Sequence, residues 1–239
     1  MPRRVFSSTN RYLRITSHLL FRTVSTSTPV LELKDLVFRY DSGDWKLRLD
    51  SLVLNKGDQM LLRAGSGKGK STLLSLIAGL MEPTSGTIKV AGQSVHGLNG
   101  AARDQFRGKH IGMIFQTFNL LQGFSALENV MAALMFAGAS PSEQKTKAQS
   151  LLKTLGITRL NAPVETLSVG QQQRVAVARA VACDPVLVLA DEPTASLDPE
   201  NAAAAMELIQ RTCRERGAAL LCVSHDPAMW TRFEHTQQL

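Results

Sequence analysis

The feature that most constrains the fold of this 239-residue chain is a glycine-rich loop, AGSGKGKST, at residues 64–72. An apolar run at 60–62 precedes the loop and LLSLIAGL (73–80) follows it, so the pattern places the loop between a strand and a helix. Glycines in such a turn let backbone N–H groups surround an anion, and the helix start adds a favourable dipole. The pattern therefore predicts an α/β fold with a phosphate site at the end of a strand. The simpler alternative is a glycine-rich turn without a ligand.

Individual residues of the loop suit a bound nucleotide. Lys70 has the reach to contact the β- and γ-phosphates, and the Ser71 hydroxyl can coordinate Mg²⁺. The other nucleotide contacts expected in the loop are Ala64, Gly65, Ser66, Gly67, Lys68, Gly69 and Thr72. The usual pattern begins with glycine, and alanine can replace it at position 64 only if the φ angle there is negative.

A second segment, VLVLADE at residues 186–192, is a short apolar run that ends in two carboxylates. Such a run predicts a buried parallel strand, and ligands of open α/β sheets bind at the carboxyl ends of the strands. We expect Asp191 to hold Mg²⁺ and Glu192 to act as the general base that activates water. A strand that ends in two acidic residues by chance is the alternative for this segment taken alone.

A third segment, LSVGQQQRVAVARAVACDP at residues 167–185, begins with a leucine and a serine and continues with apolar residues at helical spacing. It predicts an amphipathic helix whose N-terminus offers a second phosphate site. One chain would then have two helix N-termini that can bind phosphate. Both can be used if two copies of the chain face each other.

Gln116 lies between the glycine-rich loop and the segment 167–185, and His225 follows the acidic strand end at 191–192. In this order the segments resemble the motifs of ATP-binding cassette (ABC) ATPases, and the resemblance covers roughly residues 30–235. The resemblance implies an α/β P-loop NTPase fold, in which an ABC ATPase core carries an antiparallel β flank and an inserted helical subdomain. It implies an enzyme that hydrolyses ATP with Mg²⁺ and forms a homodimer on ATP binding. LSVGQ stands where the family has LSGGQ, so Val169 departs from the pattern.

Residue roles follow from the resemblance position by position. It implies that Glu192, His225, Gln116 and Lys70 are catalytic, and that Ser71, Gln116 and Asp191 contact the metal. It further implies that the γ-phosphate bound by the opposite subunit is contacted by Ser168, Gly170 and Gln171. The loop that crosses the dimer interface would contain Ser196, Leu197 and Asp198.

An aromatic residue ahead of the phosphate loop stacks on adenine in this family, and Tyr40 resembles it. Trp45 is a rival, and ordinary packing is the alternative for either ring. Stacking of a base on an aromatic ring contributes about 1–3 kcal/mol.

The charge distribution divides the chain into residues 1–29 and an ATP-binding domain at 30–239. The net charge is +7, and five arginines precede the first acidic residue, Glu32. Without these five arginines, the rest of the chain has too little net positive charge to indicate nucleic-acid binding. The arginine-, serine- and threonine-rich tail has the composition of an organellar transit peptide, and a disordered extension or an upstream start codon is the alternative.

The rest of the chain shows strand and helix patterns. Strands are expected at 30–40, 45–54, 85–92, 110–116 and 219–223, the first two forming the antiparallel flank. Helices are expected at 101–106, 126–136, 142–155 and 199–217, and residues from about 117 to 183 form the helical subdomain. No apolar stretch approaches the ~20 residues that cross a bilayer. The three cysteines show no metal or disulfide spacing and are interpreted as free thiols.

The segment TFNLLQGFSALENV (117–130) places Phe118, Leu120, Leu121 and Phe124 in an expected loop, where exposed apolar side chains are costly unless a partner covers them. We hypothesise that this patch receives a cytoplasmic helix of a transmembrane permease. The alternative is that these residues seal the helical subdomain.

The sequences FQTFNLLQGFSALENV (115–130) and EPTSGTIKVAGQSV (82–95) are most similar to those of ATPases that serve lipoprotein-releasing and macrolide-export permeases. The resemblance therefore implies a peripheral subunit on the cytoplasmic face of the inner membrane, which contacts the membrane through the permease only. If the tail is a transit peptide, the expected location is instead an organellar inner membrane. An amino-acid importer ATPase and a cell-division ATPase that transports nothing remain open.

Overall fold

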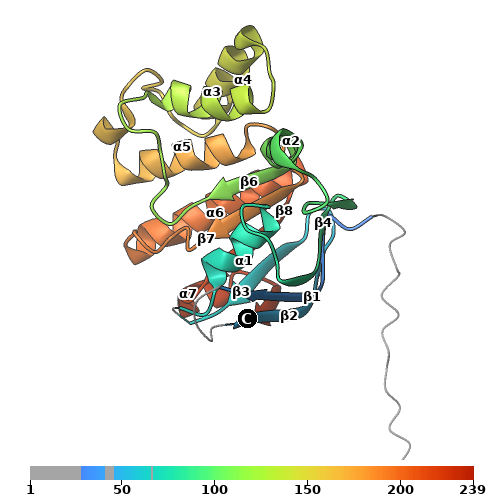
Figure 1. Ribbon diagram of the computed structural model, residues 1–239. Helices are drawn as coiled ribbons and strands as arrows, with labels where there is room; N and C mark the ends of the chain where they lie inside the picture. The colour runs from blue at the N-terminus through green and yellow to red at the C-terminus, as the bar shows by residue number, and fades with distance from the viewer. Residues whose placement is uncertain (1–27, 41–45, 66) are drawn as a thin grey trace, which may run out of the picture.

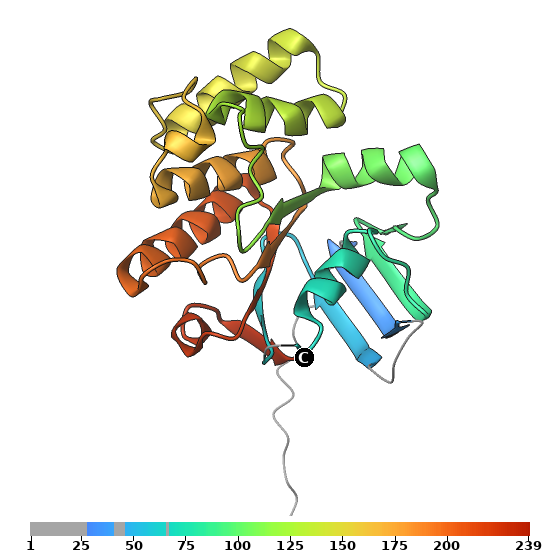
Figure 2. The same cartoon turned by 60° about the vertical axis from the view of Figure 1, so that its left-hand side comes forward.

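The computed structural model describes residues 28–40, 46–65 and 67–239, which form two β-sheets and a set of helices (Figures 1 and 2). Most of the predicted N-terminal tail, as well as Trp45 and Ser66, lies outside the described residues.

One sheet is antiparallel and has the strand order β2-β1-β4-β5. Its strands are β1 (Leu31–Arg39), β2 (Lys46–Leu54), β4 (Ser85–Val90) and β5 (Gln93–Ser94). Buried and exposed residues largely alternate along β2, because one face of the sheet packs on the core and the other meets solvent. The predicted antiparallel flank is confirmed, and β4 belongs to it.

The second sheet is parallel, with the order β6-β7-β8-β3-β9. Its strands are β3 (Gln59–Arg63), β6 (Ile111–Ile114), β7 (Leu187–Asp191), β8 (Ala219–Ser224) and β9 (His235–Gln238). Alternate residues of β7 enter two different cores: Leu187 and Leu189 pack toward α1 and the antiparallel sheet, and Val188 and Ala190 pack toward the other helices. Burial on both faces explains why this strand reads as a continuous apolar run.

Helix α1 (Lys70–Ile77) follows β3 and lies between the two sheets (Figure 2). Helix α6 (Pro199–Arg216) covers the opposite face of the parallel sheet, and α7 (Pro227–Trp230) precedes β9. Helix α2 (Gly100–His110) is longer than the predicted 101–106. It continues through Gly108 to His110, and the basic residues of its last turn interact favourably with the helix dipole.

The segment between β6 and β7 contains helices and, in the described structure, no strand (Figure 1). These helices are α3 (Ala126–Phe136), α4 (Pro141–Thr154), the 3-10 helix η1 (Val164–Thr166) and α5 (Val169–Val181). Ser125, Ser140 and Ser168 start α3, α4 and α5, each with a reciprocal side-chain and backbone capping box. Helix α5 approaches β6 so closely that a methyl group at Gly112 would lie 2.1 Å from the Ala180 carbonyl oxygen.

Among the described helices, none is both long enough and apolar enough to span a bilayer.

Candidate nucleotide site

A pocket of about 600 Å³ opens at the carboxyl edge of the parallel sheet. It gathers residues that are far apart in the sequence, and every one of them is a predicted site residue. The lining consists of Tyr40, Gly67, Gly69, Lys70, Ser71, Thr72, Gln116, Asp191, Glu192 and His225. The carboxyl ends of β3, β6, β7 and β8 meet here because the strands run parallel.

The glycine-rich loop has the geometry of an anion site. Gly67 and Gly69 have φ angles of 72° and 87°, a region that glycine enters without strain. Gly69 is the N-cap of α1 and supplies no side-chain acceptor, so the first N–H groups of the helix remain available to a ligand. Ala64 is buried and has no positive φ angle, which meets the condition for alanine at this position.

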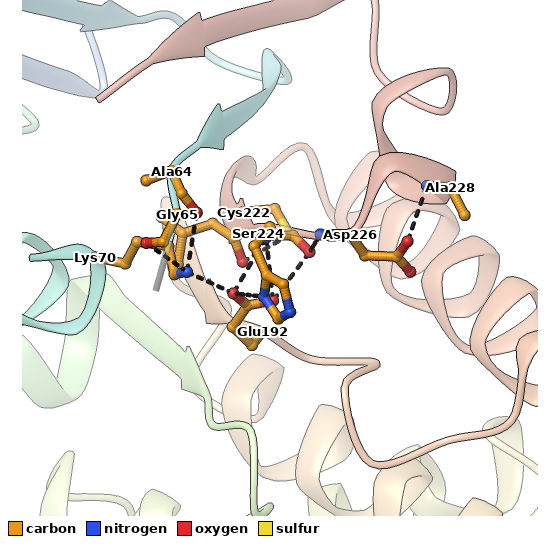
Figure 3. A network of polar contacts seen from close by, with 10 residues as sticks. Ala64, Gly65, Lys70, Glu192, Cys222, Ser224, Asp226 and Ala228 are labelled. Atoms are coloured by element: carbon orange, nitrogen blue, oxygen red, sulfur yellow. Dashed lines mark hydrogen bonds and ion pairs between the residues drawn. The ribbon is translucent and has the colours of Figure 1, made fainter. Parts of the chain in front are cut away.

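Lys70 reaches from α1 across the pocket to Glu192 at the end of β7 (Figure 3). Its Nζ lies 2.8 Å from Glu192 Oε1, and it also donates to the carbonyl oxygens of Ala64 at 3.0 Å and Gly65 at 3.2 Å. Both side chains of the ion pair are largely buried, with exposed fractions of 10% and 7%. The ammonium group is therefore held by Glu192 and the loop at the place where a phosphate would bind.

Glu192 is held on both carboxylate oxygens. Ser224 Oγ donates to Oε2 at 3.0 Å, the His225 backbone N–H donates to Oε1 at 3.1 Å, and His225 Nδ1 lies 2.5 Å from Oε1. Burial alone would raise the pKa of Glu192, but the hydrogen bonds from Lys70, His225 and Ser224 outweigh it and lower the pKa below its ordinary value. Glu192 also has a left-handed φ of 44°, an unusual conformation for a residue with a side chain. The carboxylate is thus ionised and fixed in one orientation.

Asp191, its neighbour, behaves in the opposite way. Burial raises the pKa of Asp191, a hydrogen bond with Ser71 lowers it, and the negative charge of Glu192 raises it further. Asp191, Ser71 and Gln116 line the pocket together and offer carboxylate, hydroxyl and amide oxygens. Mg²⁺ prefers such oxygen donors and usually combines one or two carboxylates with substrate phosphates. The donor set therefore fits Mg²⁺ beside a nucleotide.

Two predicted groups lie elsewhere. Ser168, Gly170 and Gln171, at the start of α5, do not line this pocket, and Ser168 and Gln171 form the capping box with each other. Ser196 lies in the loop after β7, where its Oγ donates to the Gln116 carbonyl oxygen at 3.4 Å, and Asp198 caps α6. Tyr40 is 45% exposed at the pocket edge, with its hydroxyl 3.0 Å from Thr72 Oγ1.

Sequence reasoning missed Ser224, which is 1% exposed and contacts Glu192 directly. The only available signal was its position between an apolar strand and His225. It also missed Arg179 of α5, whose contacts with the loop after Gln116 join residues about 60 positions apart.

The expected apolar patch after Gln116 requires a correction. Phe118 and Leu120 are each 7% exposed and belong to the core formed with the helices, so they seal the helical segment. Leu121 and Phe124 are 43% and 48% exposed. The loop also has a left-handed φ of 60° at Phe118, which the sequence does not reveal.

The phosphate loop between β3 and α1, the parallel sheet and the acidic end of β7 define a P-loop NTPase. A family model described as ABC transporter matches residues 47–195. The chain belongs to the ABC transporter family, as one of its ATP-hydrolysing cassette subunits.

Relatives of known sequence agree with this assignment. The chain is 40% identical over 207 residues to the lipoprotein-releasing system ATP-binding protein LolD of Alcanivorax borkumensis, covering 85% of this chain and 91% of the relative. It is 47% identical over 178 residues to the ABC transporter ATP-binding protein YtrE of Bacillus subtilis, covering 74% and 77%. Among solved structures it resembles the ATP-binding cassette MJ0796, a dimer in a post-hydrolysis state bound to ADP and Pi. The TM-score is 0.75 and the identity 33%, over 87% of this chain and 94% of the other.

Proposed function

We propose that two copies of this chain close head to tail around two ATP molecules and thereby drive a separate transmembrane permease. Each ATP would lie between the loop 64–72 of one copy and the start of α5 of the other. The observation that carries this proposal is the surface at the start of α5. Ser168, Val169 and Gly170 are exposed, and a methyl group at Gly170 would meet nothing within 4 Å in the same chain. The chain's own packing therefore gives no reason for glycine there, whereas a nucleotide held by a second copy does.

Hydrolysis would use the residues gathered in the pocket. The backbone N–H groups of the loop and the Lys70 ammonium bind the phosphates, once Lys70 exchanges Glu192 for a phosphate oxygen. The Glu192 carboxylate takes a proton from the attacking water, since its lowered pKa keeps it ionised at neutral pH. Gln116, which lines the same pocket, orients that water, and His225 holds the Glu192 carboxylate beside the γ-phosphate. Tyr40 stacks on the adenine ring.

Asp191, Ser71 and Gln116 would hold Mg²⁺. When bound, the ion neutralises charge on the β- and γ-phosphates. Asp191 has to be ionised for this purpose, and the Ser71 hydrogen bond counteracts the effect of burial on its pKa.

The permease would contact the apolar surface left by the loop after Gln116. Leu121 and Phe124 are exposed in this loop. A groove between α2, β6, α3 and α5 is lined by residues that precede and follow the loop in the sequence, among them Phe115 and Phe136, and by Arg179. Similarity to LolD favours a permease of the lipoprotein-release or export type, and hence a position on the cytoplasmic face of the inner membrane.

The dimer is tested with the Glu192→Gln variant, which keeps the shape of the site. Removal of the general base should lower turnover by at least ~10²-fold. The variant should then form a dimer with ATP, measured by size-exclusion chromatography with light scattering, and remain a monomer with ADP. Adding Gly170→Asp should abolish the dimer, because its carboxylate would face the γ-phosphate. Ser142→Asp is the matched control, because it places the same charge at the second residue of another exposed helix, α4.

A dimer that survives Gly170→Asp would exclude the start of α5 from the interface. Normal turnover in Glu192→Gln would remove Glu192 from its role. The permease itself is identified by extracting membranes that contain Glu192→Gln with ATP and determining which membrane protein co-purifies. If the membrane protein no longer co-purifies with a variant that carries Leu121→Asp and Phe124→Asp, but still does with Ser142→Asp, the permease contacts Leu121 and Phe124.

A further inference from the structure

We propose that Arg179 is a positioning residue for Gln116, because it clamps the loop after β6 in a strained conformation that places Gln116 in the nucleotide pocket. This inference rests on the proposed role of Gln116 at the reacting phosphate.

The loop carries strain at two consecutive residues. Phe118 and Asn119 have φ angles of 60° and 47°, in the left-handed region that residues with side chains seldom enter. Asparagine tolerates this region better than most residues, whereas a bulky aromatic residue does not. Such conformations persist only where the surrounding structure holds them, and they concentrate at functional sites.

Arg179 holds both strained residues through their carbonyl groups. Its Nη2 donates to the Phe118 oxygen at 2.7 Å and its Nη1 donates to the Asn119 oxygen at 2.5 Å. The planar guanidinium presents its N–H groups as a rigid fork, so one side chain can fix two neighbouring carbonyl groups. The Phe118 ring is anchored separately in the helical core.

The position of Arg179 is explained by this loop and by no ion pair in the described part of the chain. Burial lowers the pKa of the Arg179 guanidinium, and no carboxylate counteracts that effect. Arg179 is half-buried, and the hydrogen-bond partners found for its side chain among the described residues are the two loop carbonyls. The hydrogen bonds of the guanidinium are therefore directed at the loop.

Gln116 lies two residues before the clamped segment and lines the nucleotide pocket. Its own carbonyl receives a long hydrogen bond of 3.4 Å from Ser196 Oγ. Release of the clamp would let Phe118 and Asn119 relax to negative φ angles and would rotate the chain next to Gln116. The Arg179 side chain also borders the groove assigned above to the permease, so contact in that groove would act on the same clamp.

The test compares Arg179→Met with Arg179→Lys in the full-length chain. Methionine removes both donors, whereas lysine keeps a charged donor but not the fork. We expect kcat for ATP hydrolysis to fall by about 10- to 10²-fold with methionine, the scale for a misplaced catalytic group, and less with lysine. The Kd for ADP should stay unchanged, because the phosphate loop is untouched. The matched control is Arg174→Met, since Arg174 lies on the same helix and donates at 3.5 Å to the Leu155 carbonyl, away from the loop.

If Arg179→Met does not fold, the strained backbone is tested at Asn119. Glycine tolerates the left-handed region and alanine does not. We expect Asn119→Ala to lower kcat with unchanged ADP affinity and Asn119→Gly to stay near the wild type. Equal kcat values for Asn119→Ala and Asn119→Gly, or for Arg179→Met and Arg174→Met, would overturn the inference. Glu192→Gln in the same assay reports separately on the proposed function, because it loses hydrolysis whether or not Arg179 positions Gln116.

Discussion

Replacement of Glu192 by glutamine should strengthen binding of ADP as well as stop hydrolysis. Glu192 accepts a charge-assisted hydrogen bond from Lys70, at 2.8 Å between two largely buried side chains. A phosphate must displace this carboxylate before it can contact the ammonium group. Glutamine keeps the shape of the side chain but offers Lys70 a neutral acceptor, which is weaker by about 1–1.5 kcal/mol. The free energy needed to free Lys70 for the phosphate falls by the same amount in the variant, which corresponds to an about tenfold lower Kd for ADP.

The measurement is calorimetric titration with ADP, which lacks the γ-phosphate and therefore avoids dimer closure. The unliganded variant should unfold at a lower temperature than the wild type, by about 2–4 °C for each kcal/mol lost in a chain of this size. Glu207→Gln is the control, because Glu207 is exposed on α6 away from the pocket. Unchanged or weaker ADP binding in Glu192→Gln would refute the claim that Glu192 competes with phosphate for Lys70.

The same ion pair predicts how this stability difference depends on pH. The folded-state pKa of Glu192 is lowered from its ordinary value of 4.5, so its contribution is fully present above pH 4.5. It is lost as the pH falls through the folded-state pKa, when the carboxylate takes up a proton. The difference in free energy of unfolding between wild type and Glu192→Gln should therefore be constant near neutral pH and narrow below 4.5. A difference that grows with acid would contradict the assignment.

Two further predictions concern the helical segment and the thiols. Phe118→Ala should lower the free energy of unfolding by about 3–5 kcal/mol, because it leaves a cavity in the core. Phe124→Ala, at an exposed position, should change it by less than about 0.5 kcal/mol; chemical denaturation measures both, and equal losses would contradict the burial. Burial raises the pKa of all three thiols, that of Cys213 to about 12, so alkylation of the folded protein should modify half-buried Cys183 first. Mass spectrometry should find Cys213 and Cys222 modified only after unfolding.

The sequence by itself determined the class of fold and the composition of the pocket, because these depend on local chemistry. Glycines at 67 and 69 followed by Lys70 and an apolar run specify a phosphate loop wherever a strand and a helix flank them. The serine starts of α3 and α5 follow from the spacing of a serine and a glutamate or glutamine three residues later. The apolar runs of β7 and β8 indicate buried parallel strands for the same local reason.

Only the tertiary structure decided which side chains face one another. Phe118 and Leu121 are both apolar residues of the same predicted loop, yet Phe118 is buried in the core formed with the helices and Leu121 is exposed. The contacts of Ser224 with Glu192 and of Arg179 with the Phe118 carbonyl join separate elements. Such contacts depend on the order of strands in the sheet and on the docking of helices. Packing of distant segments sets both, and no local pattern in the sequence encodes them.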